Sequence, residues 1–176
     1  LWMKAKLEAR FGPVKMEWKN FKHAGVVYHQ CADYKLITHE QVDFVLAMEF
    51  FGVPKERRKQ KNSPLTAAEH KGFRSILGGL RWVTRTRADV SAELGELQTH
   101  AHAPLVCHLI QANALLRRAK DTAKANVLTY RQQPSGPKRL VLDADSSFDS
   151  RVDAKSRSIS GWTVVLMPDL EETLDT

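Results

Sequence analysis

The clearest periodic pattern in the chain lies between Thr66 and Asp89. Apolar residues recur there at positions i, i+3, i+4 and i+7, which fall on one side of an α-helix. These residues are Phe73, Ile76, Leu77 and Leu80. Thr66 and Glu69 precede them with the spacing of a capping box, in which a hydroxyl and a carboxylate satisfy free N–H groups. The pattern predicts a helix with Thr66 at its N-cap and one face on a core.

Gly78 and Gly79 interrupt this apolar face. Each glycine costs about 1 kcal/mol relative to alanine inside a helix. We therefore expect another backbone segment to approach the helix closely at this point.

Two helices are predicted earlier in the chain. Residues 1–11 read as the end of a helix that stops at Gly12-Pro13. A second capping-box pattern, Thr38 to Gln41, predicts a helix that ends at Gly52-Val53-Pro54. The apolar face of that helix consists of Val42, Val45, Leu46 and Phe50.

Two more helices are predicted after the long one. Asp89 or Ser91 is expected to cap the first, which stops near Pro104. Proline suits the first turn of a helix, so Pro104 is expected to open the second. The apolar stripe of this last helix consists of Leu105, Leu109, Ala112, Leu116 and Ala119.

The alternation of apolar and polar residues predicts strands in two regions. Val14 to Tyr28 alternates at period two, with Gly25 at a bulge or turn and a short continuation at Leu36-Ile37. This region is expected to form a β-hairpin or meander. Arg139 to Asp145 and Ser158 to Met167 are expected to form an antiparallel pair. Between these regions, the prolines and glycine of residues 132–138 predict a linker and domain boundary.

Composition adds a strong charge asymmetry. The net charge is +7, but residues 1–139 carry 24 Lys/Arg and 12 Asp/Glu, whereas residues 140–176 carry 3 and 8. A basic body favours a polyanionic partner, and we rank nucleic acid first. No run of 18 apolar residues predicts a membrane span. Cys31 and Cys107 lack a CxxC spacing and are expected to be thiols in a reducing compartment.

Clusters of basic residues are the candidate nucleic-acid contacts. They are Arg81, Arg85 and Arg87 after the long helix, Arg117, Arg118 and Lys120 in the last turn of the final helix, and Lys55, Arg57 and Arg58. Cations in a last turn also complement the helix dipole. Residues 55–62 hold five cations and one glutamate, a composition that favours a solvated linker over a phosphate contact.

Asp143 and Asp145 are the candidate metal ligands. At positions i and i+2 of a strand they share a face, and hard carboxylate oxygens suit Mg²⁺. The alternative is a polar strand end that enters a loop, and the DxD pair alone favours that alternative. The histidines match no metal-ligand spacing.

Several segments, taken in order, resemble the copia-type retrotransposon Pol polyprotein. FRSILGGL (73–80) and TRAD (86–89) resemble the family's [YF]RSLIGSLLYL…TRPD, with Ala88 in place of proline. HLIQANALLRRAKDT (108–122) resembles its HLxAAKRILRYLKGT helix. DADSS (143–147) and RSISGW (157–162) resemble DADWAG…RKSTSGY, with Ser146-Ser147 in place of the tryptophan region. The resemblance covers most of residues 7–167.

The resemblance implies an α+β fold: a β-hairpin or meander, a helical thumb and connection, and a truncated ribonuclease H-like α/β start. Residues 1–62 would be the end of the reverse transcriptase palm and the start of the thumb, and 63–131 the thumb and connection. Residues 132–138 would be the linker, and 139–176 the first strands of ribonuclease H.

The resemblance also implies a function. The chain would be a fragment of an RNA-directed DNA polymerase and ribonuclease H polyprotein, found in a cytoplasmic particle or the nucleus. It would bind an RNA–DNA hybrid or DNA template–primer and the rest of the polyprotein. Asp143 would be the first catalytic and Mg²⁺-binding carboxylate of the parent enzyme. The polymerase aspartates would precede residue 1, so this chain alone is expected to be inactive. The alternative is a degenerate, non-catalytic, basic helical protein that binds nucleic acid or another partner.

Overall fold

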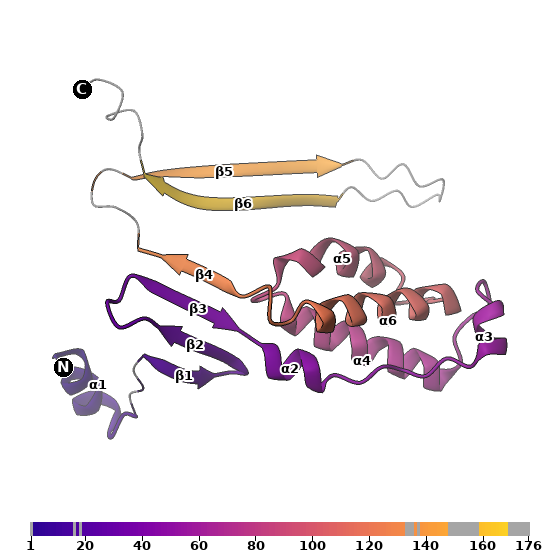
Figure 1. Cartoon of the computed structure of the whole chain (residues 1–176), viewed down its shortest axis with the longest axis horizontal. Helices are drawn as coiled ribbons and strands as arrows, with labels where there is room; N and C mark the ends of the chain where they lie inside the picture. Colours follow the sequence, from indigo (N-terminus) through magenta and orange to yellow (C-terminus); the bar gives the residue numbers. More distant parts are fainter. Residues whose placement is uncertain are drawn as a thin grey trace. The chain divides into compact units, whose positions relative to one another are not determined.

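The structure is a computed structural model that describes residues 2–15, 17, 19–132, 136, 138–147 and 159–168. The chain divides into two units, Leu1–Arg131 and Gln132–Thr176 (Figure 1). The first unit holds a four-stranded sheet and a group of helices, and the second holds a two-stranded sheet. This arrangement confirms the α+β class. The described helices include none that is long and apolar enough to cross a membrane.

Helix α1 spans Trp2–Phe11 and ends as predicted, where Gly12 takes a φ of +82°. None of its described residues is buried. Trp2 and Phe11 are each 70% exposed, so α1 adds nothing to the core of the unit.

The four-stranded sheet is antiparallel, in the order β1-β2-β3-β4. Its strands are Asn20–His23, Val26–Gln30, Leu36–Glu40 and Leu128–Arg131. The first hairpin turns on Ala24 and Gly25, whose φ angles of +47° and +77° suit a type I′ turn. The predicted meander is confirmed. No local pattern predicts β4, because its four residues pair with a strand that is distant in sequence.

The strand predicted to begin at Val14 begins instead at Asn20. Val14 and Lys15 have no regular structure, and Lys19 has a φ of +66°, which interrupts an extended backbone. Met16 and Trp18, which suggested the alternation, lie outside the described residues.

One ring from each strand forms a row across the sheet. Phe21 stacks on Tyr28 with their centroids 4.8 Å apart, and Tyr28 meets His39 edge-on at 4.4 Å. His39 then lies 4.9 Å from Tyr130. Cross-strand aromatic pairs contribute about 0.2–1 kcal/mol each. No described strand residue belongs to the main core cluster, so these pairs give the sheet side-chain contacts that the core does not supply.

Helix α2 spans only Val42–Ala47, and its predicted capping box is wrong. Thr38 lies in β3 and pairs with His29 of β2, so its backbone belongs to the sheet and does not begin a helix. Residues 48–54 have no regular secondary structure, and Phe50 lies in this segment rather than on a helix.

Helix α3, Lys55–Lys59, occupies the segment predicted to be a solvated linker. None of its residues is buried, yet Arg57 anchors it. The Arg57 guanidinium donates to both carboxylate oxygens of Glu69 at 2.8 Å and to the Pro64 carbonyl at 2.7 Å. Polar contacts of Arg57 therefore hold a helix whose residues are all unburied.

Helix α4 spans Ala67–Val83, and its capping box is confirmed. The Thr66 N–H donates to Glu69 Oε2 at 2.8 Å, and the Glu69 N–H donates to Thr66 Oγ1 at 3.3 Å. All four predicted apolar positions are buried.

The close approach expected at Gly78-Gly79 is made by a side chain rather than by a backbone. A Cβ on Gly79 would lie 2.4 Å from the Met48 methyl group, whereas a Cβ on Gly78 would have nothing within 4 Å. A second contact, at Gly72, was not predicted, and a Cβ there would lie 2.0 Å from the Phe51 ring. The segment that follows α2 therefore rests on α4 at two glycines.

Two α-helices complete the first unit. The short 3₁₀ helix η1, Ala88–Val90, leads into α5, Ser91–Thr99, and α6 spans Val106–Asp121. No side-chain bond caps α5, so the predicted cap at Asp89 or Ser91 is absent. Most of the buried core comes from α4, α5 and α6, with Val45 and Val53 added from the preceding segment.

Pro104 precedes the N-cap of α6, Leu105, and does not lie in its first turn as predicted. The Leu105 N–H donates to Nδ1 of His108 at 3.0 Å. The free N–H at this helix start is thus satisfied by a histidine.

The second unit contains β5, Lys138–Ser147, paired antiparallel with β6, Ile159–Pro168. The predicted strand pair is confirmed, although β5 begins at Lys138, inside the predicted linker. The assignment of either unit to a polymerase or ribonuclease H domain stays a prediction.

Candidate nucleic-acid interface

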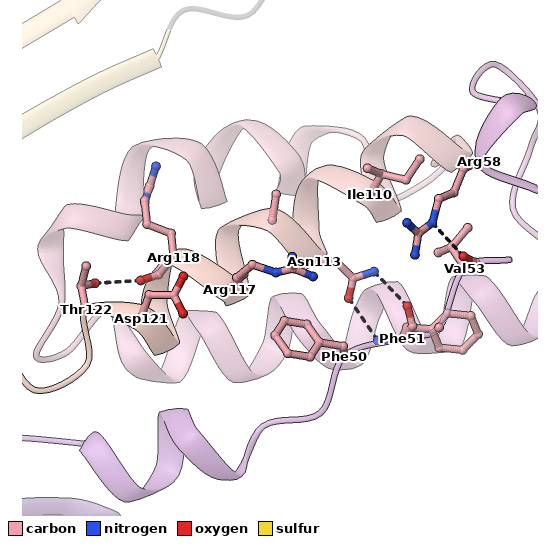
Figure 2. A pocket seen from close by; sticks show the side chains of 12 residues that line it. Phe50, Phe51, Val53, Arg58, Ile110, Asn113, Arg117, Arg118, Asp121 and Thr122 are labelled. Carbon is pink, nitrogen blue, oxygen red and sulfur yellow. Dashed lines mark hydrogen bonds between the residues drawn. The ribbon is translucent and has the colours of Figure 1, made fainter. Parts of the chain in front are cut away.

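An irregular segment lies along α6 and forms one wall of a groove (Figure 2). Asn113 of α6 holds this segment at Phe51. Its Oδ1 accepts from the Phe51 N–H at 3.1 Å, and its Nδ2 donates to the Phe51 carbonyl at 2.9 Å. The side-chain amide thus replaces the partner that a neighbouring strand would supply.

The groove between this segment and α6 has a volume of about 730 Å³. Figure 2 shows Arg58 at one end, beside Val53 and Ile110, Arg117 in the middle with its guanidinium toward Asn113, and Asp121 at the other end. The lining contains three arginines, Arg58, Arg117 and Arg118, and one carboxylate, Asp121. Its charge therefore favours an anionic ligand.

Arg117 and Lys120 both lie over the ring of Phe50. The Arg117 guanidinium carbon is 5.6 Å from the ring centroid, and the Lys120 Nζ is 5.0 Å from it. Lys120 also donates to the Leu46 carbonyl at 2.9 Å. Among the described residues, Arg117 makes neither a hydrogen bond nor an ion pair, and its N–H groups remain available to a ligand.

Arg58 and Arg118 are partly engaged within the chain. The Arg58 Nε donates to the Val53 carbonyl at 2.8 Å, and the other N–H groups of this exposed side chain have no partner among the described residues. Arg118 forms an ion pair with Glu93 of α5, and both side chains are about half exposed. Of the groove arginines, Arg117 is the one that forms neither a hydrogen bond nor an ion pair in the described structure, whereas Arg58 bonds to a carbonyl and Arg118 to a carboxylate.

The arginines at the end of α4 differ in their surroundings. Arg81 is exposed, as is Arg85, which lies 4.4 Å from the centroid of the Trp82 ring. Lys71 and Arg74 are exposed on the same helix. These side chains leave α4 with a cationic surface.

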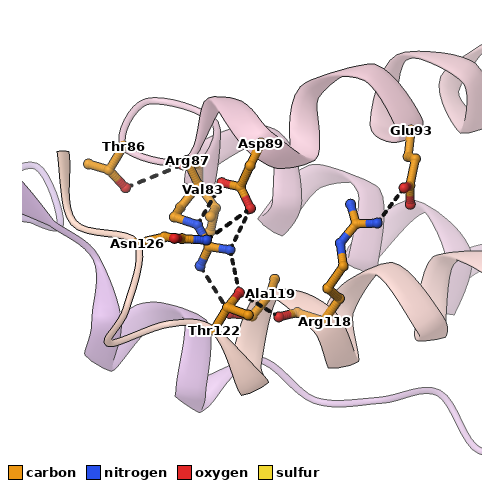
Figure 3. Close-up of polar contacts among 9 residues, drawn as sticks. All are labelled: Val83, Thr86, Arg87, Asp89, Glu93, Arg118, Ala119, Thr122 and Asn126. Carbon is orange, nitrogen blue, oxygen red and sulfur yellow. Dashed lines mark hydrogen bonds and ion pairs between the residues drawn. The ribbon is translucent and has the colours of Figure 1, made fainter.

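Arg87 is buried, with only 3% of its surface exposed (Figure 3). Its guanidinium donates to Asp89 at 2.8 and 2.7 Å, to the Ala119 carbonyl at 3.1 Å and to Thr122 Oγ1 at 2.7 Å. The Arg87 hydrogen bonds hold the pKa of Asp89 below its usual value. Arg87 joins the turn after α4 to the end of α6, so this burial does not fit the predicted phosphate contact.

Arg57 is also engaged within the chain. Its hydrogen bonds lower the pKa of Glu69 from 4.5 to about 2, against the opposing effect of burial. Arg57 is therefore a structural anchor of α3. Lys55 at the start of α3 is exposed.

Asp143 and Asp145 lie in β5, opposite Thr163 and Gly161. Their side chains lie outside the described part of the chain, so the predicted Mg²⁺ site stays a prediction. In the part that the structure describes, no group of three or more His, Cys, Asp and Glu residues is arranged to hold a metal ion.

Comparisons with protein-family models, curated proteins and solved structures found no match for this chain. The resemblance to the copia-type polyprotein rests on the sequence motifs alone.

Sequence reasoning missed two residues that shape the groove. The sequence pattern predicts Phe50 on the apolar face of a helix and includes Asn113 in no motif. Asn113 directly follows Ala112 of the apolar stripe of α6, and a polar residue at this position is the one sequence signal that could have indicated a specific hydrogen-bond partner.

Proposed function

We propose that this chain binds nucleic acid through the basic surface of its helical unit, with the groove on α6 as the main contact. The observation that carries the proposal is Arg117, a cation beside an exposed aromatic ring with no carboxylate partner among the described residues. Arginine guanidinium groups bind phosphate oxygens through paired N–H donors. Arg58, Lys120, Arg81 and Arg85 would add further contacts to the backbone.

The ordered motifs support a more specific assignment. We infer that the chain is the template–primer-holding part of a copia-type reverse transcriptase and ribonuclease H polyprotein. Its ligand would be an RNA–DNA hybrid or a DNA template–primer, and its partner the rest of the polyprotein. Asp143 and Asp145 would belong to the Mg²⁺ site of the ribonuclease H. The alternative is a degenerate relative that binds nucleic acid or another partner without catalysis.

A charge-reversal experiment tests the binding surface. Binding of a labelled RNA–DNA hybrid is measured by fluorescence anisotropy for the unchanged chain, for Arg117→Glu and for Arg10→Glu. Arg10 lies on α1, whose described residues are all unburied, and its reversal changes the net charge equally. We expect Arg117→Glu to weaken binding about tenfold, since a charged hydrogen bond contributes about 1.5–3 kcal/mol. Equal weakening by both variants would show that net charge, and not the groove, holds the ligand.

Sequencing of the reading frame on both sides of this chain distinguishes an intact polyprotein from a degenerate relative. Polymerase aspartates upstream and a ribonuclease H glutamate downstream would support an intact polyprotein. Early stop codons in the same reading frame would support the degenerate relative.

A further inference from the structure

The groove on α6 has an apolar floor beside Arg58 and Arg117. Phe50 is 43% exposed, although it is a large aromatic side chain. Phe51, Val53 and Ile110 continue the apolar lining. An exposed aromatic ring in a concave site offers a surface on which a planar group can stack.

Cations lie at separate points along this floor. Arg117 and Lys120 lie over the Phe50 ring, so a base that stacks there would share the ring with these cations. Arg58 lies beside Ile110 (Figure 2). Ile110 and Arg117 are two turns apart on α6, which corresponds to about 10 Å along the helix axis. Arg58, beside Ile110, and Arg117 therefore lie at different points along the groove, as contacts to two anionic groups of one strand would require.

The groove is held in shape before any ligand arrives. Asn113 fixes the backbone of Phe51, Val53 accepts a hydrogen bond from Arg58, and Lys120 donates to the Leu46 carbonyl. A preformed site loses less conformational freedom on binding. The volume of about 730 Å³ lies within the range of small-ligand sites, about 300–1,000 Å³.

We propose that the groove binds an unpaired nucleotide of a nucleic-acid strand, with its base stacked at Phe50 and its flanking phosphates at Arg117 and Arg58. This inference rests on the proposed nucleic-acid binding and adds a preference for a single-stranded segment. A paired base is already stacked on both faces inside a duplex, whereas an unpaired base can swing out onto an aromatic side chain. The cations select a phosphate-bearing ligand over a neutral planar one.

Three labelled DNA probes test the proposal on the full chain by fluorescence anisotropy. They are a blunt duplex, the same duplex with a short single-stranded overhang, and the same overhang with abasic sites in place of its bases. The abasic probe keeps every phosphate and removes only the stacking groups. The variant Phe50→Leu keeps an apolar side chain and removes the ring. Tyr130→Leu is the matched control, because Tyr130 is an aromatic residue that is 52% exposed outside the groove.

We expect the unchanged chain to bind the intact overhang about fivefold or more tightly than the abasic overhang, because one stacked base contributes about 1–3 kcal/mol. This ratio should fall close to one in Phe50→Leu and persist in Tyr130→Leu. Equal affinity for the two overhangs, with retained binding of the duplex, would overturn the nucleotide site and leave the proposed function intact. A ratio lost only in Tyr130→Leu would place the stacking on the sheet and overturn the site in the groove. No binding of any probe at low salt would overturn the proposed function itself.

Discussion

Asn113 and Phe51 are joined by two hydrogen bonds between a side-chain amide and a main-chain peptide group, at 3.1 and 2.9 Å. The residues are far apart in sequence, and the pair fixes the irregular segment that forms one wall of the groove. The shape of the candidate interface thus depends on Asn113, together with the hydrogen bonds of Arg58 to Val53 and of Lys120 to Leu46.

Substitution of Asn113 should therefore destabilise the fold. Asn113→Ala leaves the Phe51 N–H and carbonyl without their partners, and we expect the free energy of unfolding to fall by about 1–3 kcal/mol. Urea denaturation followed by circular dichroism measures the change. Gln111→Ala is the control, because Gln111 is exposed on the same helix and should change the stability by less than about 0.5 kcal/mol. Equal effects of the two substitutions would contradict the role assigned to Asn113.

The glycines of α4 give a prediction whose sign changes with position. Gly78→Ala should raise the stability by about 1 kcal/mol, since alanine is the better helix former and a Cβ there would have nothing within 4 Å. Gly72→Ala should lower it by about 1–3 kcal/mol, because the new Cβ would overlap the Phe51 ring. Thermal unfolding of the two variants should shift in opposite directions, and a loss of stability in Gly78→Ala would show that the packing around α4 differs from this description.

Arg87 and Arg85 lie close together in sequence and differ in environment. Arg87→Met removes the donors to Asp89, to the Ala119 carbonyl and to Thr122. We expect the free energy of unfolding to fall by about 3 kcal/mol. This value is near the lower end for a broken buried ion pair, because the Asp89 side chain is 41% exposed. Arg85→Met should lower the free energy of unfolding by at most about 1 kcal/mol, the contribution of an exposed cation–π contact. Chemical denaturation of both variants measures the difference, and a small effect at Arg87 would contradict its structural role.

The ionisation of Glu69 should make the free energy of unfolding depend on pH. Its pKa is about 2 in the folded chain against an ordinary value of 4.5, because Arg57 donates to its carboxylate. The unfolded state then binds more protons between these values, so stability rises with pH across this window. The contribution is fully present above pH 4.5 and is lost as the pH falls toward 2.

Denaturation midpoints measured between these pH values should show a steep slope in the unchanged chain and a shallower one in Glu69→Gln. Glu56→Gln serves as the control, because the Glu56 side chain is 79% exposed, and it should leave the slope unchanged. A slope that survives in Glu69→Gln would assign the acid sensitivity to other carboxylates.

Local patterns predicted the parts of the fold that local chemistry determines. The Thr66–Glu69 capping box and the buried face of α4 depend on residues within a few positions of each other. Thr38 shows the limit of this reasoning: its motif matched a helix start, but pairing with His29 placed it in a strand. Tertiary contacts decide such cases.

The sequence predicted the positive charge of the candidate interface but not the shape of its groove. Arg117 and Arg58 were found from basic clusters, whereas burial of Arg87 followed from partners at Ala119 and Thr122 that are distant in sequence. Likewise, the hydrogen bonds between Arg57 and Glu69 hold a helix in a segment whose composition predicts a solvated linker. A cluster of arginines in a sequence does not show which of them are already paired.

The salt dependence of nucleic-acid binding tests the central claim most directly. Each phosphate contact should contribute a slope of about −0.9 to a plot of log K against log salt concentration for duplex DNA. We predict tight binding at low salt and a linear decrease of log K with log salt concentration. The slope should correspond to several phosphate contacts and should be shallower for Arg117→Glu. An affinity that is absent at low salt, or that does not change with salt, would contradict the claim that this chain binds nucleic acid through its basic surface.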